Sequence, residues 1–265
     1  MLYYRAMTGR ADALRSWLMN WRATDFEFRN RFWLIGGIFG LGFLGYAVDA
    51  VNAAEALARL ILQRATGDSA ELERMIRMIL AAGAALALVA ALVRSWATAY
   101  LHGAVVHDAV IHSDRLVADG PYRHVRNPLY LGTMLLGLGM GPLASRTGYA
   151  VIVIGITAFS LRLINREEAE LRHSQGDGYR RYCAAVPRLM PAWRARVPAG
   201  GGRPNWVDGL ASESFIWGFA LGSVGFAASL KPAVLWCLAA LGFAARFAHD
   251  SYIKGRARSG RSASE

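Results

Sequence analysis

The sequence contains few cysteines and no arrangement of them that would bind a metal. Its 265 residues include only two, Cys183 and Cys237, which are far apart and belong to no Cys-x-x-Cys pair. Disulfide frameworks and structural zinc sites need several cysteines at short, regular spacings. We therefore expect neither a disulfide scaffold nor a metal site.

Acidic residues are also scarce relative to basic ones. Lys and Arg total 30 and Asp and Glu total 19, which gives a formal net charge of +11. A soluble chain with this charge would suggest nucleic-acid binding, but no run of base-stacking aromatics and no recognition motif accompanies it. The arginines flank apolar blocks, as the positive-inside bias of membrane proteins produces. We expect a membrane as partner and no nucleic acid.

Long apolar blocks are what the sequence has in excess. Hydrophobic residues make up 54% of the chain, against about 45–50% in soluble domains. Most of the blocks approach the length that a helix needs to cross a ~30 Å hydrocarbon core at 1.5 Å per residue. The pattern predicts an all-α, polytopic helical membrane protein with about six transmembrane helices, including two helical hairpins. The predicted spans are 32–51, 75–97, 129–144, 148–164, 215–230 and 233–247.

The distribution of Lys and Arg predicts the orientation of these spans. Segments 1–31, 99–128, 162–210 and 246–265 hold 23 of these residues, and the alternate connections hold five. Because Lys and Arg accumulate on the cytoplasmic side, we expect both termini and both long polar segments there, in a bacterial inner membrane. Aromatic residues alternate with arginines in 1–31, which favours an interfacial helix.

Turn-forming and basic residues meet just before the third span. Gly120-Pro121 predicts a turn, and Asn127 is biased away from helical geometry because Pro128 follows it. Pro128 then suits the first turn of a membrane helix. The nearby polar residues Arg123, His124, Arg126 and Asn127 could hold an anionic or hydroxylated ligand. Alternatively, they are ordinary juxtamembrane residues that contact lipid phosphates.

Two adjacent carboxylates, Glu167 and Glu168, follow the fourth span. At the end of a membrane helix such a pair is costly unless it reaches water or partners. The carboxylates could bind ribose hydroxyls or the positive charge of a ligand. Alternatively, the helix continues into solvent, where pairs such as Glu168 with Arg172 stabilise it.

The two segments together resemble a known family. DRLVADGPYRHVRNPLYLG, followed by REEAELRHSQGDGYRRYCAAVPRLMP, is similar to the isoprenylcysteine carboxyl methyltransferases and the related phospholipid N-methyltransferases. Their pattern is GPY…R(H/N)PxYxG, a helical hairpin, and EE…L…G..Y..Y…VPR..P. The resemblance covers roughly residues 110–191. It implies a cytoplasmic pocket for S-adenosyl-L-methionine and an acceptor that enters from the bilayer.

The resemblance also implies site residues. His124, Arg126, Asn127 and Glu168 are the expected catalytic residues, with His124 as the candidate base. The expected cofactor-binding residues are Gly120, Tyr122, Arg123, Asn127, Pro128, Tyr130, Leu131, Glu167, Glu168, Tyr179 and Tyr182. Position 127 is Asn where isoprenylcysteine enzymes usually have His, and 85–103 lacks the Gly-x-Gly of phospholipid methyltransferases. These departures leave the acceptor open.

The predicted function is therefore methyl transfer to a lipid-like acceptor, either an isoprenoid carboxylate or a phospholipid amine. Two alternatives remain: an NADPH-dependent double-bond reductase of the sterol-reductase type, and a non-catalytic membrane subunit with the same fold. The expected organisation is an amphipathic segment (1–31), two spans with a connector (32–98), a methyltransferase-like core (99–210), a membrane hairpin (211–250) and a basic tail (251–265).

Overall fold

Each predicted apolar block overlaps a helix of the computed structural model, which describes residues 21–62, 69–107 and 118–262. No strand occurs in these ranges, so the all-α prediction is confirmed. The α-helices are α2 (Asp25–Arg29), α3 (Arg31–Leu44), α4 (Ala53–Leu62), α5 (Ser69–His107), α6 (Pro128–Met140), α7 (Arg146–Ala185), α8 (Trp206–Ser212), α9 (Ser214–Ser229) and α10 (Pro232–Ser262). Short 3-10 helices are η1 (Gly45–Ala47), η2 (Gly120–Arg123) and η3 (Gly141–Leu143).

Three of the described helices are long and apolar enough to cross a membrane. They are Ser69–Leu101, Arg146–Ala185 and Pro232–Ile253. The pair α8 and α9, bent by 63°, can form a fourth span. Two apolar segments, Arg31–Ala47 and Pro128–Leu143, are shorter. The structure thus supports a multi-span membrane protein with three or four candidate spans, and the total of about six stays a prediction.

The first predicted span was too long. Helix α3 ends at Leu44, whereas the apolar pattern predicted a span to residue 51. The helix lies very close to α7, because a Cβ at Gly42 would come within 2.3 Å of the Ile152 side chain. The chain then leaves the helical path through η1 and brings Asp49 to Arg146 at 3.0 Å. Tertiary contacts with α7, which hydropathy does not encode, therefore end this helix.

Three other helices are longer than predicted, and one of them, α10, continues past the predicted end at 247 to Ser262. Helix α5 continues past the predicted end at 97 to His107. Helix α7 contains the predicted span 148–164 and most of the second motif, in two helical segments that meet at Gly176, whose φ of 51° and ψ of -124° are not helical. The carboxylates Glu167 and Glu168 therefore lie within a continuous helix.

The described part of the N-terminal segment is not one amphipathic helix, contrary to the prediction for 1–31. Residues 21–24 are non-helical, and α2 is only five residues long. Thr24 forms a capping box with Glu27, which fixes where α2 begins. The remainder of the predicted interfacial helix, residues 1–20, lies outside the described residues.

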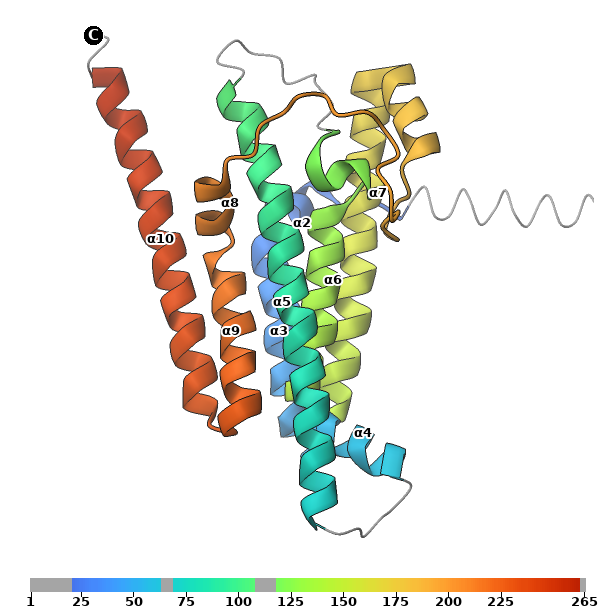
Figure 1. Ribbon diagram of the computed structural model, residues 1–265, viewed down its shortest axis with the longest axis vertical. Coiled ribbons are helices and arrows are strands. Elements are labelled where there is room, and N and C mark those ends of the chain that lie inside the picture. The colour runs from blue at the N-terminus through green and yellow to red at the C-terminus, as the bar shows by residue number, and fades with distance from the viewer. Residues whose placement is uncertain (1–20, 63–68, 108–117, 263–265) are drawn as a thin grey trace, which may run out of the picture.

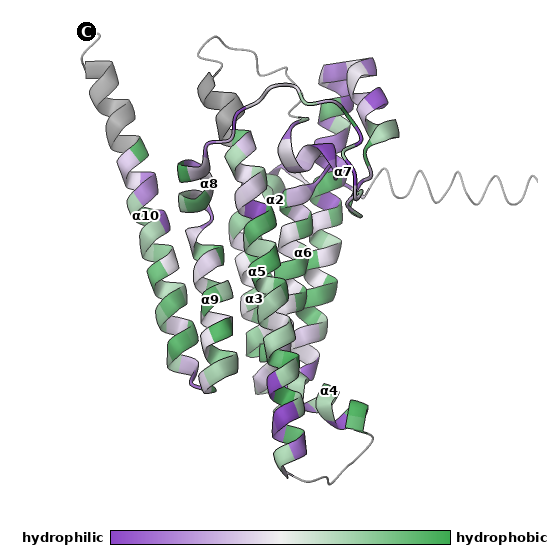
Figure 2. Cartoon of the chain, in the orientation of Figure 1, coloured by the Kyte–Doolittle hydropathy of each residue, from purple (hydrophilic) through white to green (hydrophobic). Residues whose placement is uncertain are grey.

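The core forms where α5, α6 and α9 meet. Small residues of α5, such as Ala87 and Ala90, pack against Leu136 and Met140 of α6 and Ala220 of α9. Helices in a membrane gain no hydrophobic free energy from associating, because lipid tails are as apolar as their side chains. Their association depends on close packing, which small side chains allow. Hydrophobic residues cover the length of the bundle, and hydrophilic ones gather at the far end of α7 (Figure 2).

Both sequence motifs lie at one end of this bundle. η2, the second half of α7 and the end of α10 lie there, whereas α4 and the start of α5 lie at the other end (Figure 1). After α7 the chain crosses the bundle to α8. We call the first end the motif end and the second the distal end. That the motif end faces the cytoplasm stays a prediction from the charge distribution.

Candidate functional site

A buried carboxylate, Glu168, forms the centre of the motif end. Its side chain is only 3% exposed, yet it lies close to three guanidinium groups. Arg172 contacts Glu168 at 3.0 Å, and Arg126 and Arg188 do so at 3.3 Å each. One carboxylate neutralises one charge, so the cluster retains a surplus of positive charge. The alternative predicted correctly that the helix continues and that Glu168 pairs with Arg172, but it is wrong that Glu168 is solvated, because the side chain is buried.

The backbone explains how residues of separate segments reach this cluster. Asn127 directly precedes α6 and donates from its side-chain amide to Glu168 (3.1 Å) and to the carbonyl of Arg188 (3.1 Å). The backbone N–H of Arg126 donates to the carbonyl of Pro187 at 2.9 Å. The segment before α6 and the segment after α7 are therefore hydrogen-bonded to each other, with the Glu168 carboxylate between them.

Arg126 carries unused hydrogen-bonding capacity. Its Nη1 atom is 2.9 Å from the sulfur of Cys183. Its Nε atom is buried and has no hydrogen-bond partner among the described residues. A buried donor without a partner costs free energy, which a ligand acceptor atom would recover. The arrangement can thus accept an anionic group.

Glu167 has a different partner from Glu168. The hydroxyl of Tyr130 in α6 donates to its carboxylate at 2.7 Å. Pro128 and Tyr130 are buried, and Leu131 is half-buried in the same first turns of α6. The two adjacent carboxylates therefore hold different parts of the site: Glu167 contacts α6, and Glu168 contacts the segments that flank α6 and α7.

Three tyrosines border the same region. The hydroxyl of Tyr182 donates to the carbonyl of Tyr122 at 2.7 Å, and the rings of Tyr179 and Tyr182 lie 5.8 Å apart. Tyr122 makes no side-chain hydrogen bond with any described residue. Burial raises the pKa of its hydroxyl, and the nearby charge of Glu167 raises it further. Tyr122 therefore stays a neutral donor at physiological pH.

The turn at Gly120 is fixed by geometry. Gly120 has φ +56°, and a Cβ there would lie 2.4 Å from the Tyr100 ring. The preceding Asp119 accepts hydrogen bonds from the backbone N–H groups of Gly200 and Gly202, at 2.7 and 2.8 Å. Only glycine fits this turn, since it needs both a positive φ and the absence of a side chain.

Arg123 and His124 contact the segment that follows α7 and not the Glu168 carboxylate. Arg123 donates from Nε to the carbonyl of Val197 at 2.9 Å, and His124 Nδ1 lies 2.9 Å from the carbonyl of Ala192. A neutral His124 that donates from Nδ1 keeps Nε2 as an acceptor. The predicted role as base therefore stays open, but no described contact joins His124 to Glu167 or Glu168.

An ion pair that sequence reasoning missed joins the C-terminal helices to α6. Arg94 of α5 contacts Glu213, between α8 and α9, at 2.7 Å, and their side chains are 17% and 6% exposed. Arg94 also donates to the Thr133 hydroxyl (2.7 Å) and to the Leu129 carbonyl (3.2 Å) in the first turns of α6. An arginine inside an apolar span was an available signal, but nothing in the sequence identified Glu213 as its partner.

Arg188 was also missed, although the VPR triplet of the second motif contains it. It lies just after α7, beside Glu168 and Asn165.

The described residues contain no group of three or more His, Cys, Asp or Glu side chains that could hold a metal ion.

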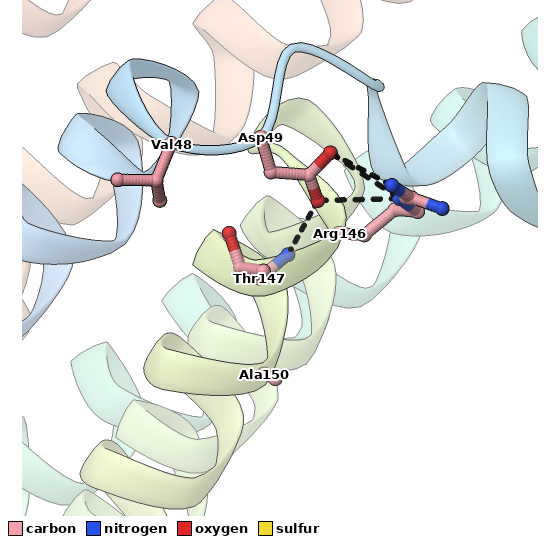
Figure 3. A pocket seen from close by; sticks show the side chains of 5 residues that line it. All are labelled: Val48, Asp49, Arg146, Thr147 and Ala150. Carbon is pink, nitrogen blue, oxygen red and sulfur yellow. Dashed lines mark hydrogen bonds and ion pairs between the residues drawn. The ribbon is translucent and has the colours of Figure 1, made fainter.

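A surface pocket lies at the distal end, away from both motifs. It is lined by Val48, Asp49, Arg146, Thr147 and Ala150 (Figure 3). The Asp49 carboxylate accepts from the Arg146 guanidinium and from the backbone N–H of Thr147 (3.2 Å), in the first turn of α7. This geometry is that of a helix cap, and we assign it a structural role.

Comparison with known proteins supports the resemblance seen in the motifs. Residues 83–173 match the model of the isoprenylcysteine carboxyl methyltransferase (ICMT) family. No curated protein and no solved structure matches the chain. The predicted family resemblance is thus confirmed over a segment that includes the first motif, Glu167 and Glu168. Tyr179, Tyr182 and the C-terminal helices lie beyond it.

Proposed function

We propose that the chain is an S-adenosyl-L-methionine-dependent methyltransferase that acts on a membrane-embedded, lipid-like acceptor. The family match supports a membrane methyltransferase. The observation that carries the proposal is the Glu168 cluster, because it gathers residues of both motifs around one buried carboxylate with an excess of guanidinium groups.

The residues present fit this cofactor chemically. S-adenosyl-L-methionine carries a carboxylate, ribose hydroxyls and a sulfonium. The unpartnered Nε of Arg126 suits the carboxylate, and Glu167 can accept from ribose hydroxyls. Tyr122 offers a hydroxyl that has no hydrogen-bond partner within the described ranges, beside the buried rings of Tyr179 and Tyr182. Faces of aromatic rings attract cations, so these rings suit a sulfonium.

Methyl transfer makes limited demands on the protein. When bound, the cofactor supplies a methyl group on a sulfonium, which is already a good leaving group. The residues around Glu168 then need mainly to orient the reactants and exclude water, and such alignment can supply about 7–11 kcal/mol in favourable cases. A base is needed for a protonated amine or a hydroxyl, but not for a carboxylate.

The acceptor is expected to enter from the bilayer. Each CH₂ of an apolar tail gains about 0.8 kcal/mol on leaving water, but almost nothing on passing from lipid to a protein groove. The tail would concentrate the acceptor, and its polar end would determine specificity. Asn127 does not titrate, which favours an acceptor that is already nucleophilic, such as an isoprenoid carboxylate, over a phospholipid amine.

The test is a titration of the purified protein with S-adenosyl-L-methionine and with NADPH, followed by transfer of labelled methyl groups in vesicles. We expect binding of S-adenosyl-L-methionine alone, and methylation of a long-chain acceptor over a short, soluble one with the same head. Binding of NADPH alone would indicate a reductase, which the family match does not favour, and binding of neither would indicate a non-catalytic subunit. Either result would overturn the proposal.

A further inference from the structure

The turn after α7 presents two large apolar side chains to the outside. Trp193 is 96% exposed and Met190 is 81% exposed. Trp193 is the most exposed large hydrophobic residue in the described part of the chain. In water such exposure is unfavourable, at about 25 cal/mol per Å² of apolar surface. We name residues 190–196 the Trp193 turn.

The Trp193 turn is held in place by backbone hydrogen bonds. The N–H of Ala192 donates to the carbonyl of His124 at 2.9 Å, and the N–H of Arg196 donates to the carbonyl of Arg123 at 2.8 Å. The ring of His124 contacts the carbonyl of Ala192 as well. Because both ends of the turn are anchored to the first motif, the outward direction of Trp193 is a fixed feature of the fold.

The position of the Trp193 turn along the axis of the bundle follows from the packing of Leu189, the residue before it. Leu189 packs against the hydrophobic cluster that contains Leu163 and Ile164, which lie at the end of the predicted apolar span of α7. The segment after α7 folds back beside the bundle before it crosses to α8 (Figure 1). The Trp193 turn therefore lies where the apolar side of the bundle meets its hydrophilic end, which is the level of the lipid headgroups.

Positive charge accompanies the apolar side chains. The side chains of Arg194 and Arg196 are exposed and have no partner among the described residues. Tryptophan prefers the membrane interface because its ring is apolar and its N–H is polar. Arginines beside an anionic leaflet gain about 1 kcal/mol each. A zwitterionic lipid or a neutral protein surface would leave these charges uncompensated.

We propose that the Trp193 turn is a binding site for anionic phospholipid, in which Met190 and Trp193 insert below the headgroups and Arg194 and Arg196 bind the phosphates. The proposal is independent of the methyltransferase assignment. Because the turn is hydrogen-bonded to Arg123 and His124, bound lipid would also stabilise the segment that leads into α6.

Insertion is tested with a fluorescent probe in vesicles that contain anionic lipid. The probe is attached at Met190→Cys, with Ser174→Cys as the control, in a chain carrying Cys183→Ser and Cys237→Ser. Ser174 is exposed on the hydrophilic part of α7. We expect lipid-borne quenchers to act at position 190 and iodide to act at position 174. Quenching by iodide but not by lipid at 190 would overturn insertion. Protection from both quenchers would mean that another segment covers the turn, and this result would also overturn insertion.

Charge recognition is tested by comparing spin-labelled phosphatidylglycerol with phosphatidylcholine for association with the protein. Arg194→Gln with Arg196→Gln should reduce the preference for the anionic lipid roughly fivefold per arginine at this site. The matched control is Arg180→Gln, an exposed arginine that already pairs with Asp177. An unchanged preference in the double variant, with a normal gel-filtration profile, would overturn the anionic-lipid assignment.

Discussion

The two ends of the bundle each hold a nearly buried carboxylate paired with arginine, and they differ in what remains unpaired. At the distal end, Asp49 is satisfied by one guanidinium and by backbone N–H groups of its own neighbourhood. At the motif end, Glu168 faces three guanidinium groups, and the Nε atom of Arg126 is buried without a partner. A satisfied pair stabilises the fold, whereas surplus donors can bind a ligand.

The largest effect should be the all-or-none labelling of the two ends from opposite sides of the membrane. In a chain without Cys183 and Cys237, Ser174→Cys should react with a membrane-impermeant thiol reagent only from the cytoplasm. Leu60→Cys, on the exposed face of α4, should react only from the other side, since the bundle lies between them. Reaction of both cysteines from one side would contradict the orientation predicted from the charge distribution.

The next comparison removes the charge of each buried carboxylate. Glu168→Gln leaves three arginines without their counterion, so we expect about 3–5 kcal/mol of destabilisation. Affinity for S-adenosyl-L-methionine, measured by calorimetry, should fall about tenfold or more. Asp49→Asn should lower thermal stability but leave the affinity unchanged. Equal affinities in wild type and Glu168→Gln would place the cofactor elsewhere.

Backbone geometry provides a second matched pair, since Gly120 and Gly176 both have positive φ. A Cβ at Gly120 meets the Tyr100 ring, whereas nothing lies within 4 Å of a Cβ at Gly176. Gly120→Ala should therefore cost about 1–3 kcal/mol more in unfolding free energy and should also weaken cofactor binding. Similar denaturation midpoints for the two variants would show that the Gly120 turn tolerates a side chain.

Removal of a hydroxyl should have different effects at Tyr122 and at Tyr130, because only the Tyr130 hydroxyl is hydrogen-bonded to a residue that the structure describes. Tyr122→Phe removes a hydroxyl with no described partner, so stability should hold while cofactor affinity falls severalfold. Tyr130→Phe breaks the hydrogen bond to Glu167 and should lower both, with a stability loss of about 1 kcal/mol. If Tyr122→Phe instead unfolds at a lower temperature and its affinity for the cofactor is unchanged, the Tyr122 hydroxyl stabilises the folded protein and does not bind the cofactor.

The smallest expected effect is the pH dependence of the stability with which α2 is held against α7 by Glu27 and Arg162. The hydrogen bond from Arg162 keeps the pKa of Glu27 below its usual value. A carboxyl with a depressed folded-state pKa contributes stability above its unfolded pKa of about 4.3 and loses it as pH falls through the lower folded value. Hydrogen exchange in α2 should rise in that range, and Glu27→Gln should abolish this dependence. An identical pH response in the variant would assign the effect to another group.

The sequence alone determined the helical class, the approximate places of the apolar segments and the two motifs. Hydropathy and Lys/Arg distribution carry this information because they describe how each segment interacts with lipid and water. The family resemblance was equally visible, and the match over residues 83–173 confirms it. The chemistry of Asn127 and Glu168 could be anticipated because both lie inside the motifs.

Only the tertiary structure decided which charges meet. Glu168 is close to Arg172 on the same helix, but its contacts with Arg126 and Arg188 arise from folding of separate segments. Likewise, Arg94 finds Glu213 across 119 residues of sequence. Such pairs depend on helix packing, and packing depends on the shapes of small residues at the contacts. A one-dimensional pattern shows that a buried charge needs a partner, but only the three-dimensional fold selects that partner.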